Sequence, residues 1–357
     1  MKSPQRETNF RRGEKFREYF QRKQAHPSLF VLAVLLLGIA LTDCYSFNDV
    51  NLSPFQKRSG RLQRKVLLSE AGPGTCIGGR PDSGKFLLIP IQGVISSDSS
   101  PGDKGTSPAK IKKLLEYARY EFGWKGILLK VNSPGGTVTD SDIIYRLIKK
   151  FAEKRKLPVY AHFENIGASG AYYVAMSARK LNVTPTGLVG SIGVIIRGFN
   201  FKGLLEKYGI KERSIFSGKN KNASSPFRDL SPEYRRHLQE QVDASRERFL
   251  TIVLSSRGKR IKEQELRALA DGRVYMSKKS VQSGLVDSRQ YLEDFLETIK
   301  KEMGIHRLTV ISFLPQEKFH ASIYDVQESR FADWRVALLR YLKISASGPL
   351  YLWDGGF

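Results

Sequence analysis

Strand-like and helix-like patterns alternate from Phe86 onward, and this alternation constrains the fold of the chain more than any other feature. Short apolar runs predict strands at 86–95, 126–131, 158–163, 181–184 and 191–196. Apolar residues at helical spacing predict helices at 108–122, 140–151 and 169–178, and then a long amphipathic helix at 231–256. This order predicts an α/β domain built on a mostly parallel sheet.

Composition divides the chain into five segments. They are a basic leader at 1–27, a hydrophobic segment at 28–47, a Gly-, Pro- and Ser-rich linker at 48–84, the main domain at 85–303 and an extension at 304–357. The extension carries a predicted strand at 308–314 and then a helical apolar pattern from Phe331 to Leu342. It could cover the site, extend an oligomer contact or simply pack as a helix, and we favour packing.

The hydrophobic segment contains an apolar run of thirteen residues, Leu29 to Leu41, preceded by eight Lys/Arg and three Glu. The run is shorter than the roughly 20 residues that span a bilayer, and extending it to Phe47 would bury Asp43. A signal-anchor helix is the favoured interpretation, and a cleaved export signal and a lipoprotein signal ending at Cys44 are the alternatives. The basic leader predicts that residues 1–26 are cytoplasmic and that the rest lies outside.

The distribution of charged residues and the spacing of cysteines and histidines exclude several classes of function. The chain has 59 Lys+Arg against 35 Asp+Glu, a formal net charge of +24, but the basic residues are spread out and form no nucleic-acid-binding motif. Its two cysteines and five histidines lack the spacing of a zinc site. We therefore expect no metal, no cofactor and no nucleic-acid partner.

Three turns rich in small residues end predicted strands, where open α/β sheets bind ligands. They lie at 132–136, 166–170 and 187–193. Ser169 stands in the second turn, so its hydroxyl would be exposed beside free backbone N–H groups. Taken alone, Ser169 is more simply explained as a helix N-cap.

The motifs around Ser169 resemble those of the signal peptide peptidase A family, a Ser/Lys-dyad branch of the Clp-protease/crotonase superfamily. The segments that carry the resemblance are Gly167–Ala175, Asn132–Gly136, Pro185–Val194, Ser217–Phe227 and Ala270–Tyr275 with Gly284–Asp287. The resemblance covers roughly residues 86–300, one copy of the catalytic unit. The resemblance implies a Clp-protease/crotonase-like fold, a superhelix of repeated β-β-α units.

The resemblance also implies roles for individual residues. Ser169 matches the nucleophile, Lys221 the general base and Ser191 the serine that orients the lysine amine. Lys219 is a rival for the base, and in either case burial must lower the pKa of the amine before it can accept a proton. The expected oxyanion-hole donors are the backbone N–H groups of Gly170 and of Gly135 or Gly136.

A Ser-His-Asp triad is the alternative mechanism, but no histidine lies near Ser191, where the Clp branch carries one. His162 precedes Ser169 by seven residues on a predicted strand, and we interpret it as a structural histidine. The resemblance implies a peptidase of the bacterial inner membrane that degrades remnant signal peptides outside the cytoplasm. Relatives with one catalytic unit form ring-like homo-oligomers, in which the serine and the lysine can come from neighbouring copies.

Two other classes of function share these features. A crotonase-like acyl-CoA enzyme would use the same glycine-rich turns to hold a thioester oxyanion, and it would retain activity after Lys221→Ala. A catalytically silent membrane scaffold would form oligomers without acylation of Ser169.

Overall fold

The computed structural model describes residues 62–70, 83–97, 105–315, 323 and 350–352. The strands are β1 (Leu62–Ser69), β2 (Ser83–Gln92), β3 (Trp124–Ser133), β4 (Gly135–Thr137), β5 (Val159–Ala168), β6 (Lys180–Val183), β7 (Leu188–Gly190), β8 (Val274–Met276), β9 (Ser288–Arg289), β10 (Arg307–Pro315) and β11 (Leu350–Leu352). The helices are α3 (Pro108–Arg119), α4 (Val138–Arg155), α5 (Gly170–Ala175), α6 (Lys202–Lys207), α7 (Pro232–Arg257), α8 (Glu263–Leu269), α9 (Ser277–Gln282) and α10 (Leu292–Met303).

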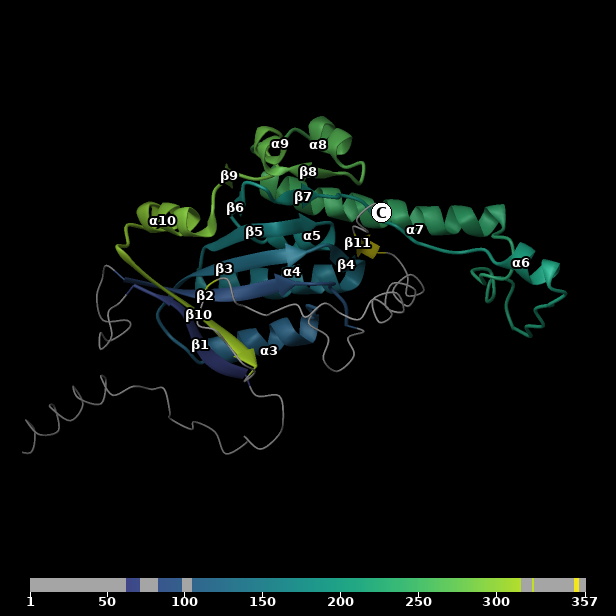
Figure 1. Ribbon diagram of the computed structural model, residues 1–357, viewed down its shortest axis with the longest axis horizontal. Helices are drawn as coiled ribbons and strands as arrows, with labels where there is room; N and C mark the ends of the chain where they lie inside the picture. Colours follow the sequence, from purple (N-terminus) through teal and green to yellow (C-terminus); the bar gives the residue numbers. More distant parts are fainter. Residues whose placement is uncertain (1–61, 71–82, 98–104, 316–322, 324–349, 353–357) are drawn as a thin grey trace, which may run out of the picture. The chain divides into compact units, whose positions relative to one another are not determined.

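The main sheet has the strand order β1-β10-β2-β3-β5-β6-β9 (Figure 1). β7 pairs with the second half of β5, and β8 pairs with β7. From β10 to β9 all neighbouring strands are parallel, whereas β1 runs antiparallel beside β10. Parallel neighbours need crossover connections, which helices supply along much of this chain. The arrangement confirms the predicted α/β class; the superhelix of β-β-α units remains a prediction.

The central strand β2 shows why the sheet is buried on both faces. Leu87 and Ile89 pack in a large core together with residues of α3, α4, α5 and α7. Phe86 and Leu88 pack in a second core with residues of α10. Because helices cover both faces, β2 reads in the sequence as a continuous apolar run instead of an alternating one.

Two predicted segment boundaries are corrected by the sheet. Strand β1 lies inside residues 48–84, which we expected to be a linker, and it pairs with β10 from Leu62↔Pro315 to Ser69↔Thr309. Strand β10 in turn lies beyond residue 303, where the domain was expected to end, and it pairs with β2 inside the sheet. The strand predicted at 308–314 is β10, but its partners, like those of β1, are far away in sequence, so no local pattern shows that either strand belongs to the main sheet.

Most other predicted elements occur within a few residues of their expected bounds, but the strand predicted at 191–196 is wrong. The extended backbone in this region is β7, which ends at Gly190, because Gly190 and Ser191 both have positive φ (123° and 50°). The hydrophobic segment 28–47 and the helical pattern from Phe331 to Leu342 lie outside the described residues. In the part of the chain that is described, no helix has both the length and the apolar character to cross a membrane.

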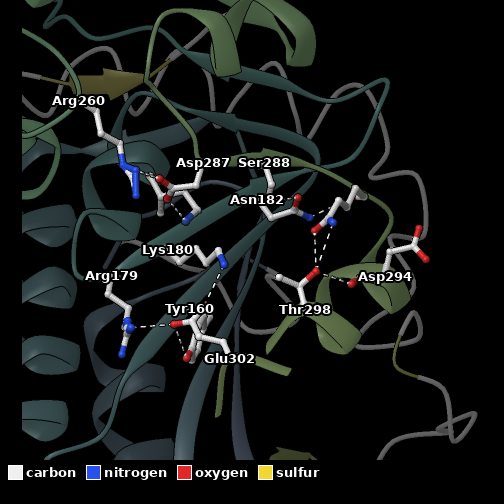
Figure 2. A network of polar contacts seen from close by, with 12 residues as sticks. Tyr160, Arg179, Lys180, Asn182, Arg260, Asp287, Ser288, Asp294, Thr298 and Glu302 are labelled. Atoms are coloured by element: carbon white, nitrogen blue, oxygen red, sulfur yellow. Dashed lines mark hydrogen bonds and ion pairs between the residues drawn. The ribbon is translucent and has the colours of Figure 1, made fainter. Parts of the chain in front are cut away.

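A polar network fastens the later helices to β5 and β6 (Figure 2). The Arg257 guanidinium of α7 is buried and bonds both carboxylate oxygens of Asp287, at 2.9 and 3.0 Å. Asp287 also accepts the Leu181 N–H at the start of β6. This network fixes the C-terminal end of α7 against the sheet.

Candidate active site

Two serines with unusual backbone geometry stand at the ends of β5 and β7. Ser169 has φ 54° and ψ −118°, and Ser191 has φ 50°. Among the described residues, only one other non-glycine residue, Lys156, has positive φ, and it is an ordinary left-handed cap of α4. Non-glycine residues in this conformation are strained and cluster at functional sites. The backbone thus singles out the two serines that the sequence motifs predicted.

The two serines are neighbours in the sheet. β5 and β7 pair in parallel with Ala168 opposite Gly190, so Ser169 and Ser191 each follow one member of the same pair. The Ser169 N–H donates to the Gly190 C=O at 2.7 Å. A Cβ at position 190 would lie 3.0 Å from the Arg273 C=O oxygen, which accepts the Ser191 N–H. Glycine at 190 therefore permits both the turn and the close approach of these chains.

Both serine residues are buried, and their hydroxyls have no hydrogen-bond partner among the residues that the structure describes. Ser169 is 1% exposed and Ser191 is 5% exposed. Within the described ranges, no hydrogen bond involves the side chain of either residue. Buried hydroxyls are nearly always hydrogen-bonded in folded proteins, so two adjacent exceptions indicate that a further group completes this site.

A buried ion pair lies where β5 changes partner. β5 pairs with β6 along its first half and with β7 along its second half, and the register of β3 against β5 shifts between Val131 and Ser133. The Nζ atom of Lys130 lies 3.2 Å from Glu164 Oε1 beside this shift, and the lysine side chain is 1% exposed. Burial raises the pKa of the Glu164 carboxyl, and the Lys130 charge opposes that rise. The pair braces the irregular part of β5 that leads to Ser169.

The predicted oxyanion donors are not equivalent. The Gly135 N–H donates to Ser133 Oγ at 3.1 Å, so it is already used within the chain. Ile95 bonds the Gly135 C=O and the Thr137 N–H, at 2.8 and 2.9 Å. Because backbone groups alternate along a strand, the Gly136 N–H faces the opposite edge of β4. Gly136 is therefore the better donor of the two, and Ser133, which the sequence motif contained without an assigned role, holds Gly135.

Close packing against Ile95 requires glycine at position 136. A Cβ there would lie 1.8 Å from the Ile95 C=O oxygen. Gly170, the other predicted donor, is the first residue of α5, and no described group accepts its N–H. Gly136 and Gly170 therefore remain as backbone donors next to the nucleophile turn.

The edge of β4 that carries the Gly136 N–H is covered by β11. The two strands are antiparallel, with Leu350 opposite Thr137, Tyr351 opposite Gly136 and Leu352 opposite Gly135. This short strand belongs to the extension that we expected to pack as a helix. The pairing shows that an extended peptide backbone fits along this edge of β4.

Lys221 is not brought to the serines within one chain. It lies in the segment 195–230, which we call the Lys221 segment, and its side chain is exposed. No described group forms a hydrogen bond or ion pair with its amine. The rival Lys219 is exposed too and pairs with Glu233 at 2.7 Å. The structure thus joins Ser169, Ser191 and the glycine donors but leaves the predicted base apart from them.

The Lys221 segment has an ordered polar core. The Glu212 carboxylate accepts hydrogen bonds from Asn222, Ser214 and Ser225. These bonds, that from Asn222 first, lower the pKa of the Glu212 carboxyl to about 2. The residue next to Lys221 is therefore held by a carboxylate that stays ionised near neutral pH.

The Lys221 segment also exposes an apolar surface. Of the fourteen large apolar side chains that are exposed in the described part of the chain, nine lie between residues 195 and 227. They are Ile195, Phe199, Phe201, Leu204, Tyr208, Ile210, Ile215, Phe216 and Phe227. Concentrated apolar exposure of this kind marks an interaction surface.

His162 has the structural role that the sequence suggested. It is 1% exposed, its Nδ1 accepts from Asn182 at 2.7 Å and its Nε2 lies 3.3 Å from Thr184 Oγ1. Burial, aided by the Lys130 charge, lowers its pKa to about 3, so the ring is neutral near pH 7. No group of three or more metal-ligating side chains occurs in the described ranges.

Comparison with known proteins identifies the class to which this site belongs. Residues 151–306 match the model of Peptidase family S49. A protein of Enterococcus faecium named as a signal peptide peptidase SppA is 37% identical over 226 residues, which are 63% of this chain and 63% of that protein. A Synechocystis sp. protein named as a protease is 37% identical over 59% of this chain and 71% of its own length. A Methanocaldococcus jannaschii protein, also named as a protease, is 33% identical over 80% of this chain and 84% of its own.

These matches define a serine peptidase. The chain belongs to peptidase family S49, the SppA family.

Proposed function

We propose that this chain is a membrane-associated endopeptidase that cleaves remnant signal peptides or other short peptides through an acyl-enzyme on Ser169. The observation that carries the proposal is the pair of buried hydroxyls of Ser169 and Ser191, which bond no group in the described part of the chain and are held side by side in strained backbone. Two peptide N–H groups are the proposed oxyanion donors: that of Gly170, and that of Gly136 on the edge of β4 that β11 covers.

Lys221 of a second copy completes the site in this proposal. The lysine is exposed in its own chain, and the segment around it presents nine exposed large apolar side chains that a second copy would bury. Burial at such an interface also removes the amine from water, which favours the neutral form that a base needs. We therefore propose a homo-oligomer, a ring as the resemblance implies, in which each serine meets a neighbour's lysine.

In this proposal peptide cleavage proceeds through an acyl-enzyme. Ser169 Oγ attacks the scissile carbonyl carbon while the Lys221 amine takes the hydroxyl proton, and Ser191 orients that amine. The N–H groups of Gly136 and Gly170 donate to the oxyanion of the tetrahedral intermediate. Lys221 returns the proton to the leaving amine as the C–N bond breaks, and it later deprotonates the water that hydrolyses the acyl ester.

The substrate is proposed to be an extended peptide. Strand β11 pairs with β4 beside the Gly136 N–H, so a substrate backbone can add to the same edge as a strand. The apolar run Leu29–Leu41, with its basic leader, is the basis for proposing the bacterial inner membrane as the location, with the catalytic domain on its outer side. The Clp-protease/crotonase-like superhelix is part of the same proposal.

Labelling by a fluorophosphonate, which phosphonylates activated serines with loss of fluoride, tests the proposal. We expect the wild-type chain to label at Ser169 and Ser169→Ala to lose the label. Lys221→Ala should slow labelling by about 10²- to 10⁴-fold, the usual contribution of a general base, whereas Lys219→Ala should leave it nearly unchanged.

Two outcomes would contradict these assignments. Loss of labelling in Lys219→Ala but not in Lys221→Ala would move the base to Lys219. A wild-type chain that never labels and hydrolyses no peptide would refute the peptidase mechanism.

A further inference from the structure

Tyr173 is directly linked to the nucleophile turn. It lies in α5, and its N–H donates to the Ser169 C=O at 3.0 Å. Its ring is fully buried. The ring centroid lies 5.6 Å from that of Tyr145, which is edge-on to it, and 5.1 Å from that of Phe249, which is tilted. Any movement of Tyr173 is therefore passed to the backbone of Ser169 and Gly170.

The Tyr173 hydroxyl donates a hydrogen bond to Oδ1 of Asp142. Asp142 lies near the start of α4, and α4 follows directly from β4, which carries Gly136. One hydrogen bond therefore joins the element that holds Ser169 and Gly170 to the element that holds the second oxyanion donor.

The same carboxylate oxygen receives a third element. Arg248 Nη2 of α7 donates to Asp142 Oδ1 at 3.0 Å, and the next residue, Phe249, packs on the Tyr173 ring. Helix α7 begins at Pro232, shortly after the Lys221 segment ends. Asp142 is thus the meeting point of α4, which follows β4, of α5, which begins next to Ser169, and of α7, which follows the Lys221 segment.

The geometry points to Asp142 as a positioning residue that, through Tyr173 and Arg248, sets the distance between the Gly136 and Gly170 donors. This inference rests on the proposed acyl-enzyme mechanism, because the two donors matter only if an oxyanion forms between them. A charge-assisted bond to a carboxylate is stronger and shorter than one between neutral groups, which suits it to fix a spacing. Asp142, Tyr173 and Arg248 touch no reacting atom, so they affect the rate only through the groups they hold.

Tyr173→Phe removes the hydroxyl that bonds Asp142 and keeps the buried ring. A donor that is free to move by about 1 Å costs up to 100-fold in rate, so we expect about a ten-fold fall in kcat for a partly loosened hole. The Michaelis constant should not change, because β4 still binds the peptide backbone in the ground state.

The test compares Tyr173→Phe with Tyr145→Phe in the full-length chain. Tyr145 lies in the same aromatic cluster, but its hydroxyl bonds Lys149 and no group of α5. Peptide hydrolysis gives kcat and KM, fluorophosphonate labelling gives the rate at which Ser169 is phosphonylated, and thermal unfolding reports stability. We expect a low kcat only for Tyr173→Phe, with Asp142→Asn restoring most of the activity that Asp142→Ala loses.

Each outcome decides the matter. If Tyr173→Phe and Tyr145→Phe behave alike while the wild type is active, Asp142 is not a positioning residue and the proposed function stands. If Tyr173→Phe does not fold, Arg248→Met replaces it at a half-exposed position, and an unchanged kcat there overturns the inference. If the wild-type chain shows neither labelling nor hydrolysis, the proposed function itself fails.

Discussion

The end of β5 and the Lys221 segment differ in almost every physical respect. Ser169 and Ser191 are buried, strained and fixed by short backbone bonds to their neighbours in the sheet. Lys221 is exposed, and it lies among large apolar side chains that no described part of the chain covers. The contrast teaches that the sheet fixes Ser169 and Ser191 within one chain, whereas the proposed base stays exposed; under the proposed function a second copy would bury it.

The ion pairs of the two regions show the same contrast. Lys130 pairs with Glu164 beside the nucleophile strand, with side chains 1% and 22% exposed. Lys219 pairs with Glu233 next to Lys221, with side chains 77% and 58% exposed. Water screens the second pair strongly, so it contributes little to folding. A buried pair that loses one partner leaves an uncompensated charge.

Mixing two inactive variants is the strongest way to break the comparison. We expect Ser169→Ala and Lys221→Ala each to lose at least about 10²-fold in labelling rate. When the two are unfolded and refolded together, one interface in about four joins an intact serine to an intact lysine, so about a quarter of wild-type activity should return. Peptide hydrolysis before and after mixing measures this recovery.

The control is a mixture of Ser169→Ala with the double variant Ser169→Ala/Lys221→Ala, which should stay inactive. A mixture of the two single variants that remains as inactive as its components would show that serine and lysine act within one chain. In that case the Lys221 segment would have to fold back onto the sheet.

The sequence predicts the position of Ser169 in the fold well, because a strand, a turn of small residues and a short helix are local patterns; its role as nucleophile stays a prediction. The position of Ser191 was not predicted, because the strand expected at 191–196 is absent and Ser191 lies beside Ser169 only through the pairing of β5 with β7. The sequence does not show that Ser133 occupies the Gly135 N–H, since that bond depends on the three-dimensional path of the turn. Strands β1 and β10 were assigned to a linker and an extension, because each meets its partner only across the whole domain.

The two ion pairs give the next largest expected difference, in stability. Lys130→Met should lower the free energy of unfolding by about 3 kcal/mol, because Glu164 is left largely buried without its partner. Lys219→Ala should leave the denaturant midpoint unchanged within error. Urea unfolding followed by tryptophan fluorescence measures both.

A second substitution separates charge from packing at the buried site. Lys130→Met/Glu164→Gln removes both charges, and it should recover most of the lost stability, because buried pairs can be replaced by uncharged groups at small cost. If Lys130→Met were as stable as the wild type, the ion pair would not brace β5, and the contrast between the two regions would rest on the serine backbone alone.

The smallest expected effect concerns β11. This strand occupies the edge of β4 to which a substrate would add, so it should affect substrate binding. Tyr351 lies opposite Gly136, whose N–H faces this edge, so the Tyr351 backbone groups also face β4. The N–H of Leu352 faces away from β4, since neighbouring residues of a strand alternate. Proline at these two positions therefore separates loss of a pairing N–H from a general effect of proline.

We expect Tyr351→Pro to lower KM for a peptide substrate by about five-fold with kcat unchanged, because a tethered strand that competes for the edge reduces the fraction of sites open to substrate. Leu352→Pro should retain the wild-type KM. Steady-state hydrolysis of one fluorogenic peptide by the three chains measures the difference. A wild-type KM in Tyr351→Pro would mean that β11 does not compete with substrate, and a higher KM would mean that it helps to shape the edge where the peptide binds.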